Sequence, residues 1–134
     1  MAGQLASLVI EGIPERFPRL KIVFIEGGLG WIPSTTWRMD QHFERFRSEV
    51  PHLKRRPSEY VKEHFWFTSQ PIDEPDEARH LRSLIEWVGA ERILFSSDYP
   101  HWDSDDPRFA FKTPLTEAER AKIFNSNARA LYKL

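Results

Sequence analysis

Residues Lys21–Gly30 have the sequence KIVFIEGGLG, in which a short continuous apolar run passes directly into a glycine-rich stretch. An apolar run of this length that ends in turn-forming residues is typical of a buried strand in a parallel sheet. The segment therefore predicts a strand over Lys21–Ile25 and a tight turn over Glu26–Gly30. The glycines do not have the spacing of a dinucleotide-binding or phosphate-binding loop, so a turn explains them better.

Two more strands are expected further along the chain. Phe65–Thr68 (FWFT) has aromatic and β-branched residues, and Arg92–Ser97 (RILFSS) is again largely apolar. Residues of these types are favoured on the pleated surface of a sheet. Together with the first segment they predict about three strands.

Helical patterns lie before, between and after these strands, as judged by apolar residues at helical spacing and by helix-capping residues. Alternating strands and helices indicate βαβ units with right-handed crossovers, and therefore an α/β fold with a parallel sheet. The expected helices are one ending near Pro14, one over about Pro33–Ser48, a short one capped by Ser58, one from Pro75 or Asp76 to a stop at Gly89, and final ones opened by a capping box of Thr116 and Glu119.

The composition excludes several classes of partner and site. Lys and Arg total 19 against 20 Asp and Glu, a net charge of -1 that gives no attraction to nucleic acid or to an anionic membrane. The basic run Lys54–Arg56 is offset by Glu49 and Glu59 and fits a solvated loop. The absence of cysteine excludes disulfides and thiolate ligands. With no leader-like or membrane-spanning segment in the sequence, we expect a cytoplasmic protein.

The loops after the strands are the expected location of a functional site, because ligand-binding groups in parallel α/β sheets gather at the carboxyl ends of the strands. Glu26, the segment Thr68–Gln70 and Asp98 occupy these positions. A carboxylate oxygen of Asp98 would be a good ligand for a divalent cation and could accept a proton from metal-bound water. The alternative is that Asp98 only caps the turn that follows it.

Other side chains in the same loops are candidates for catalysis or substrate binding. Glu26 could act as a general base or hold a substrate hydroxyl group, or could instead form an ion pair that supports its loop. Trp31 and Trp102 could form the walls of a pocket. His101, close to Asp98, could contact a substrate or could stabilise the loop.

Three segments resemble, in order and spacing, landmarks of one enzyme family. They are Phe17–Gly28 (FPRLKIVFIEGG), Ile93–His101 (ILFSSDYPH) and Asn127–Tyr132 (NARALY). The family is the amidohydrolase-related group that includes aminocarboxymuconate-semialdehyde decarboxylase. The resemblance implies that residues 1–134 form a partial barrel domain, namely strands six to eight and the flanking helices in the C-terminal part of a (β/α)8 TIM-type barrel.

The resemblance also implies a divalent metal, with zinc expected first and manganese as the alternative. In the family a His-x-His pair, a further histidine and an aspartate hold the metal. Asp98 matches the aspartate, but Glu26 occupies the position of the family's histidine after strand six, and this chain has no His-x-His pair. The implied reaction is hydrolysis or nonoxidative decarboxylation of a small carbonyl or carboxylate compound, and the departure at Glu26 leaves both open.

An incomplete barrel should be unstable in isolation, because about eight strands are needed to remove every sheet edge. The inward face, from Val23, Ile25, Phe67 and Leu94 or their neighbours, would expose apolar surface to water. We therefore expect self-association or binding of a complementary N-terminal half, with enzymatic activity only once the missing strands are supplied. The alternative function is a non-catalytic remnant or an association module that pairs through its uncovered sheet.

Overall fold

The computed structural model describes residues 1–134 and has a parallel three-stranded sheet in the order β1-β2-β3. The strands are β1 (Ile22–Phe24), β2 (Phe65–Thr68) and β3 (Ile93–Leu94). β2 pairs on both sides, with Phe24 opposite Phe67 and Leu94 opposite Thr68. The predicted α/β fold with three parallel strands is confirmed.

β3 is shorter than the predicted strand Arg92–Ser97 because its backbone finds other partners. The N–H of Phe95 donates to the carbonyl of Ile123 at 2.9 Å, and the N–H of Ser96 donates to the hydroxyl of Ser69 at 3.3 Å. These bonds replace the regular ladder to β2. The segment after Leu94 therefore leaves the sheet and begins the loop that carries Asp98.

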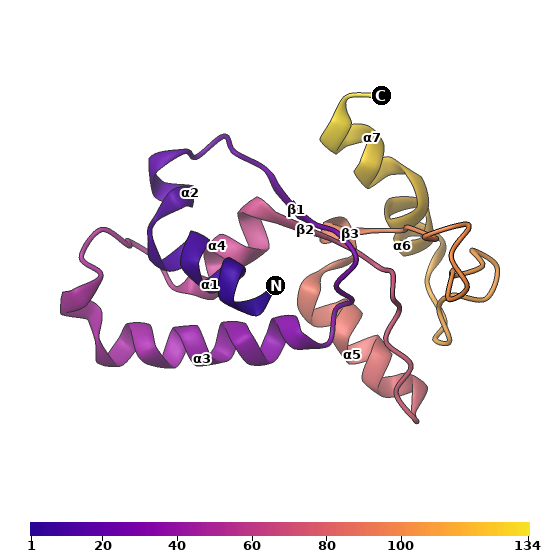
Figure 1. Cartoon of the computed structure of the whole chain (residues 1–134), viewed down its shortest axis with the longest axis horizontal. Helices are drawn as coiled ribbons and strands as arrows, with labels where there is room; N and C mark the ends of the chain where they lie inside the picture. The colour runs from indigo at the N-terminus through magenta and orange to yellow at the C-terminus, as the bar shows by residue number, and fades with distance from the viewer.

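In Figure 1, α1 to α4 lie at one end of the view and α6 and α7 at the other. None of them is long and apolar enough to cross a membrane. Their bounds are α1 (Ala2–Ile10), α2 (Ile13–Arg16), α3 (Trp31–Arg45), α4 (Pro57–His64), α5 (Ala78–Val88), α6 (Glu117–Ala121) and α7 (Asn127–Tyr132), with a π-helical turn over Lys122–Ser126 and 3-10 turns over Arg47–Glu49 and Ala90–Arg92.

Three predicted helix starts differ from the structure and two helix signals are confirmed. α3 begins at Trp31, two residues before the predicted Pro33. Ser58 does not cap α4, because Pro57 occupies the first helical position and Arg56 precedes it as the N-cap. α5 begins at Ala78, two residues after the predicted Asp76, with the residue before it still extended. Gly89 ends α5 with φ 91°, and the capping box of Thr116 with Glu119 opens α6, as predicted.

The core lies between the sheet and helices α1, α3, α4 and α5 and contains 18 buried residues. Phe24, Phe65 and Phe67 point to this side, and the ring centroids of Phe65 and Phe67 lie 6.0 and 5.9 Å from that of Phe24. Trp31 of α3 packs on Phe24 and Phe67 at 5.8 and 6.1 Å. Each buried aromatic contributes about 1.5–3 kcal/mol, so this cluster fixes the helices on the sheet.

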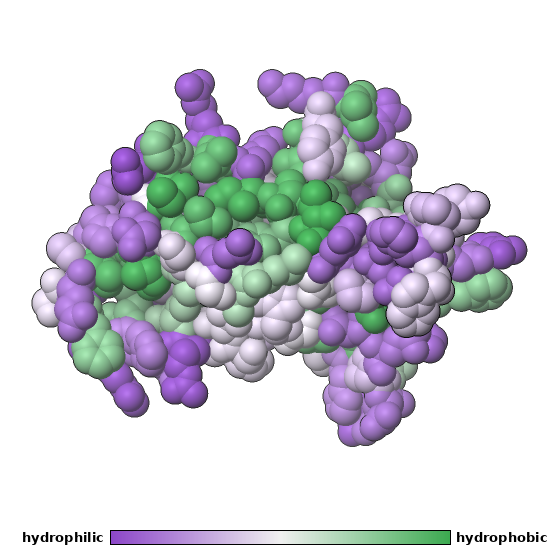
Figure 2. Space-filling view, in the orientation of Figure 1, coloured by the Kyte–Doolittle hydropathy of each residue, from purple (hydrophilic) through white to green (hydrophobic).

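The opposite face of the sheet is only partly covered. Ile25 is 54% exposed, and Val23 is half-buried. Phe67, which the sequence placed among the uncovered residues, is buried because alternation along β2 turns it towards the helices. Leu94, also expected to be uncovered, pairs with Thr68 on the other face and is nevertheless buried. Figure 2 shows the resulting apolar surface along β1 and the segment before it.

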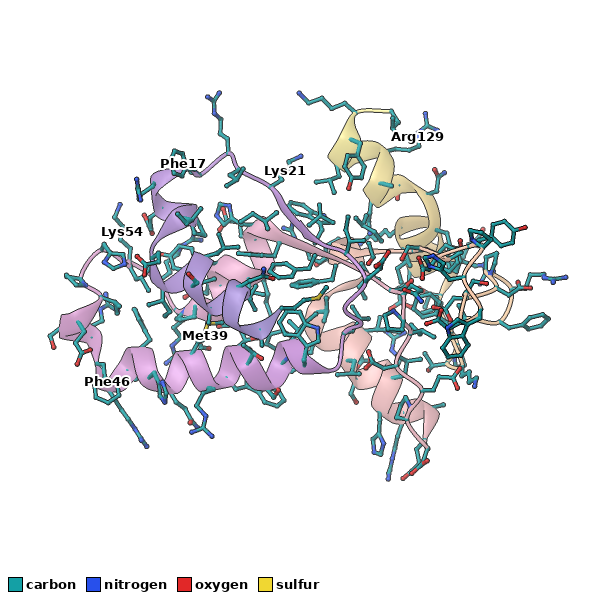
Figure 3. All side chains as sticks on the ribbon, in the orientation of Figure 1. Phe17, Lys21, Met39, Phe46, Lys54 and Arg129 are labelled. Carbon is teal, nitrogen blue, oxygen red and sulfur yellow. The ribbon has the colours of Figure 1, made fainter.

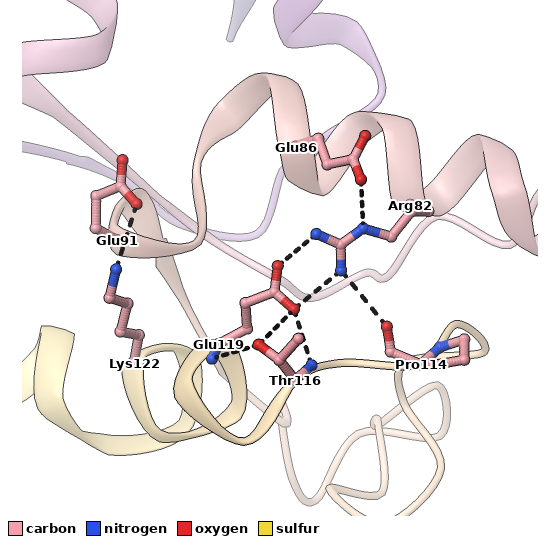
Figure 4. Close-up of polar contacts among 7 residues, drawn as sticks. All are labelled: Arg82, Glu86, Glu91, Pro114, Thr116, Glu119 and Lys122. Atoms are coloured by element: carbon pink, nitrogen blue, oxygen red, sulfur yellow. Dashed lines mark hydrogen bonds and ion pairs between the residues drawn. The ribbon is translucent and has the colours of Figure 1, made fainter.

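The C-terminal helices are attached to α5 by one cluster of charged side chains (Figure 4). Both guanidinium Nη atoms of Arg82 bond to Glu119, and its Nε donates to Glu86 at 2.8 Å. Glu119 also accepts from the N–H of Thr116 at 2.9 Å. These bonds lower the pKa of Glu119 to about 2.

We expect Glu119→Gln to reduce the free energy of unfolding by about 1 kcal/mol at pH 7, as is usual for a partly exposed ion pair. Because the pKa of Glu119 is lowered from 4.5 to about 2, this contribution is complete above pH 4.5 and is lost as the pH falls towards 2. Urea unfolding of both proteins across this pH range measures it. Glu91→Gln, which breaks an exposed contact to Lys122 at 3.9 Å, is the control and should change stability by less than about 0.5 kcal/mol. Equal effects of the two substitutions would contradict the prediction.

Candidate functional site

Glu26 and Asp98 follow β1 and β3 at the same edge of the sheet, because parallel strands end on one side. Each has a left-handed backbone conformation with φ 58°, and Lys133 near the end of the chain is the only other non-glycine residue with positive φ. This conformation costs about 1–2 kcal/mol for a residue with a Cβ atom. Strained residues of this kind are often found at functional sites.

Asp98 is paired with His101. The Nδ1 atom of His101 lies 2.8 Å from Oδ2 of Asp98, whose side chain is 17% exposed while that of His101 is 66% exposed. The hydrogen bond and the charge of Asp98 raise the pKa of His101 above its usual value, and the charge of Glu26 adds to this effect. Asp98 is therefore the main partner of His101, and the charge of Glu26 makes a smaller contribution.

Glu26 is exposed, but its backbone is fixed from β2. Its N–H donates to the hydroxyl oxygen of Thr68 at 2.9 Å, and Thr68 is only 7% exposed. Thr68 belongs to the segment that the strand-end argument selected. Its contact with Glu26 joins residues 42 positions apart.

Two further aspartates hold the loops together, and sequence reasoning missed both. Oδ2 of Asp73 accepts from the N–H groups of Leu29 and Gly30 at 2.7 and 2.9 Å. Oδ2 of Asp105 accepts from the N–H of Ile72 at 3.2 Å, and burial raises the pKa of Asp105. No local motif marks them; their positions in loops after strands were the only available signal.

The two tryptophans predicted to line a pocket, Trp31 and Trp102, lie in different environments. Trp31 is half-buried, and its indole N–H donates to the carbonyl of Gly27 at 2.9 Å. Trp102 is 97% exposed on the loop after β3. Substrate contact by either tryptophan, or by His101, stays a prediction.

This chain on its own does not form a metal centre. No group of three or more His, Cys, Asp or Glu side chains is placed to hold an ion, whereas a catalytic zinc site has about three protein ligands and an open position. The carboxylate of Asp98 has the right chemistry for one ligand. The remaining ligands would have to come from outside these residues.

Three parallel strands with carboxylates at their shared carboxyl edge define this chain as part of an α/β fold. The chain belongs to the amidohydrolase family, whose sequence profile matches residues 2–134. This confirms the resemblance seen in the three sequence segments.

Several relatives of this chain are decarboxylases. Gamma-resorcylate decarboxylase of Rhizobium sp. (strain MTP-10005) is 35% identical over 130 residues, which cover 95% of this chain and 38% of that enzyme. The 2-amino-3-carboxymuconate-6-semialdehyde decarboxylase of Dictyostelium discoideum is 32% identical over 98 residues, covering 72% of this chain and 25% of that enzyme. The chain thus spans well under half the length of these relatives.

The solved structures to which this chain is similar also include a decarboxylase. Dihydroxybenzoic acid decarboxylase of Polaromonas sp. JS666, solved with bound manganese and the inhibitor 2-nitroresorcinol, has a TM-score of 0.74 and 31% identity. The match covers 99% of this chain and 40% of that one. The sheet and helices described above therefore correspond to part of a TIM-type barrel, as predicted.

The strain at Glu26 can be tested by comparing two substitutions. Glu26→Gly should be more stable than Glu26→Ala by about 1 kcal/mol, because only glycine adopts positive φ without a Cβ penalty. Urea unfolding measures the difference. Glu49 lies outside this loop in a 3-10 turn and is the control position. There the alanine variant should be more stable than the glycine variant. A more stable alanine variant at position 26 as well would contradict the left-handed conformation of Glu26.

Proposed function

We propose that this chain supplies strands six to eight of a metal-dependent decarboxylase barrel that acts on a small carboxylate compound. The observation that carries the proposal is the placement of Glu26 and Asp98 at one edge of the sheet, both in left-handed conformations. Relatives over 95% of this chain are named as decarboxylases, which favours decarboxylation over hydrolysis. The reaction would require strands that these residues do not provide.

Asp98 is the proposed metal ligand contributed by this chain. Manganese bound in the Polaromonas structure supports manganese as the ion, with zinc as the alternative. A divalent cation would polarise substrate oxygens and neutralise their charge. His101 would orient the Asp98 carboxylate through their 2.8 Å bond.

Glu26 is proposed to contact the substrate. An ionised carboxylate is only an acceptor, so it would hold a substrate hydroxyl and take its proton. Loss of that proton from a hydroxyl beside the carboxylate increases the electron density on an aromatic ring. The ring carbon that carries the carboxylate could then take this proton back from Glu26, and as its bond to the carboxyl carbon breaks, carbon dioxide would leave and the ring would remain as the phenolate.

Trp31, Trp102 and His101 are proposed to border the substrate. Trp102 is almost fully exposed, so it is free to cover a planar ligand. Trp31 is half-buried beneath the Glu26 loop, with its N–H already bonded, so it could present only its ring.

A chimera provides the test of this function. This chain would replace the matching 38% of the Rhizobium gamma-resorcylate decarboxylase, and release of carbon dioxide from 2,6-dihydroxybenzoate would be measured with Mn²⁺. We expect activity that Asp98→Ala reduces by at least about a hundredfold, together with a loss of bound manganese, because the substitution removes a metal ligand.

Asp103→Ala is the matched control, since Asp103 is an exposed acid in the same loop, and it should leave activity and metal content unchanged. A folded, manganese-loaded chimera without activity would refute the proposed reaction. Full activity and metal content in Asp98→Ala would refute the role of Asp98.

Association through the uncovered sheet is a second candidate function, supported by a groove between α1 and β1. The groove has a volume of about 610 Å³ and is lined by Met1, Gly3, Gln4, Ser7, Leu8 and Ile22–Ile25. It runs beside β1, whose outer edge has no neighbouring strand. An open strand edge with apolar surface favours pairing with another chain.

We expect the isolated chain to self-associate and Ile25→Lys to shift it towards the 15.8 kDa monomer, because a charge in this groove opposes its burial. Light scattering after size-exclusion chromatography measures the mass. Phe46→Lys is the control, because Phe46 is similarly exposed at 49% but lies beyond the far end of α3 (Figure 3). A monomeric wild-type chain, or equal effects of both substitutions, would contradict this candidate.

A further inference from the structure

We infer that Thr68 and Asp73 are positioning residues that together fix the loop carrying Glu26. Both lie in the segment that begins at the end of β2, and both bond to backbone N–H groups of the loop Glu26–Gly30. The inference rests on the proposed function, because it concerns how Glu26 is aimed at a substrate. It assigns neither residue a direct contact with that substrate.

Thr68 fixes the start of the loop. Its hydroxyl oxygen accepts from the N–H of Glu26 at 2.9 Å. Thr68 is buried and paired with Leu94 in the sheet, so its own backbone is well fixed. Glu26 lies beyond the end of β1 at Phe24, and the hydroxyl of Thr68 is the partner of its N–H. The hydroxyl thus helps to hold a backbone conformation that is otherwise unfavourable.

Asp73 fixes the end of the same loop. One carboxylate oxygen accepts from both Leu29 and Gly30, at 2.7 and 2.9 Å. Gly30 is the N-cap of α3, so the charge also lies favourably at the start of that helix. Hydrogen bonds to an ionised acceptor are stronger than neutral ones. The loop is therefore attached at both ends to a single neighbouring segment.

The glycines of the loop allow this close approach. A Cβ atom at Gly28 would lie 2.9 Å from the carbonyl oxygen of Pro71, and one at Gly30 would lie 2.7 Å from Oδ1 of Asp73. Both distances are shorter than side chains tolerate. Gly28 and Gly30 are thus explained by docking against the segment after β2, in addition to the turn itself, whereas a Cβ atom at Gly27 would meet the side chain of Met1.

The same segment also contacts the loop that carries Asp98. The N–H of Ile72 donates to Asp105 at 3.2 Å, and the N–H of Asp105 donates to the carbonyl of Ser97 at 2.8 Å. The segment from Thr68 to Asp73 therefore lies between the loops of the two candidate carboxylates. Its side chains can set the position of Glu26 relative to Asp98.

Two pairs of substitutions test the inference. Thr68→Val keeps the shape of the side chain but removes the acceptor, whereas Thr68→Ser keeps the acceptor. Asp73→Ala removes the other acceptor, and Asp73→Asn retains one amide oxygen. Hydrogen exchange of individual backbone amides would be measured by NMR in the 134-residue chain.

We expect the Glu26 amide to exchange at least about tenfold faster in Thr68→Val than in the wild-type chain. In Thr68→Ser this amide should keep its wild-type protection. The amides of β2 should keep their wild-type protection in both variants. Asp73→Ala should accelerate exchange at Leu29 and Gly30 in the same way, with partial recovery in Asp73→Asn. Unchanged protection at these amides would overturn the inference. A uniform loss of protection throughout the chain in both Thr68→Val and Asp73→Ala would also overturn it, because both residues would then stabilise the whole fold and not one loop.

The chimera supplies the functional readout. There Thr68→Val should lower kcat by about tenfold to a hundredfold, because misplacement of a substrate-contacting group slows the reaction strongly, and Thr68→Ser should restore it. Normal kcat in Thr68→Val despite a freely exchanging Glu26 amide would overturn the positioning role. If the parent chimera is inactive while the exchange results are as expected, the proposed reaction has failed and the attachment of the loop stands.

Discussion

Pairing of β2 with a parallel strand on each side is the constraint on which the rest of the structure depends. It brings the carboxyl ends of β1 and β3 to the same edge, although Glu26 and Asp98 are far apart in the chain. The pairing is stabilised by burial of the aromatic rings of Phe24, Phe65 and Phe67 beneath the helices. Any chemistry at this edge therefore depends on a core that lies on one face of the sheet.

At this edge, unfavourable backbone conformations are matched by specific hydrogen bonds. Glu26 and Asp98 both have positive φ, and each is adjacent to a polar partner, the hydroxyl of Thr68 or the imidazole of His101. A strained backbone conformation persists only where the surrounding structure holds it in place. The loops after the three strands thus form one connected group with the segment after β2 at its centre.

The sheet is a part of a larger architecture. The chain matches the amidohydrolase family along almost its whole length yet covers only 38% of a gamma-resorcylate decarboxylase. Consistent with this, β1 has an open edge, Ile25 is largely exposed, and no set of metal ligands is complete. In a closed barrel, neighbouring strands supply both the backbone partners of such an edge and further side chains at its carboxyl end.

The sequence by itself determined the alternation of strands and helices, the position of β2, the stop at Gly89 and the capping box at Thr116, because these depend on local periodicity and on contacts within a few residues. It also selected Glu26 and Asp98 as strand-end carboxylates. Only the tertiary structure decided the strain at both residues and the attachment of their loops through Thr68, Asp73 and Asp105. Those bonds join residues about 30 to 45 positions apart; no local pattern encodes them, because they exist only once the strands have paired.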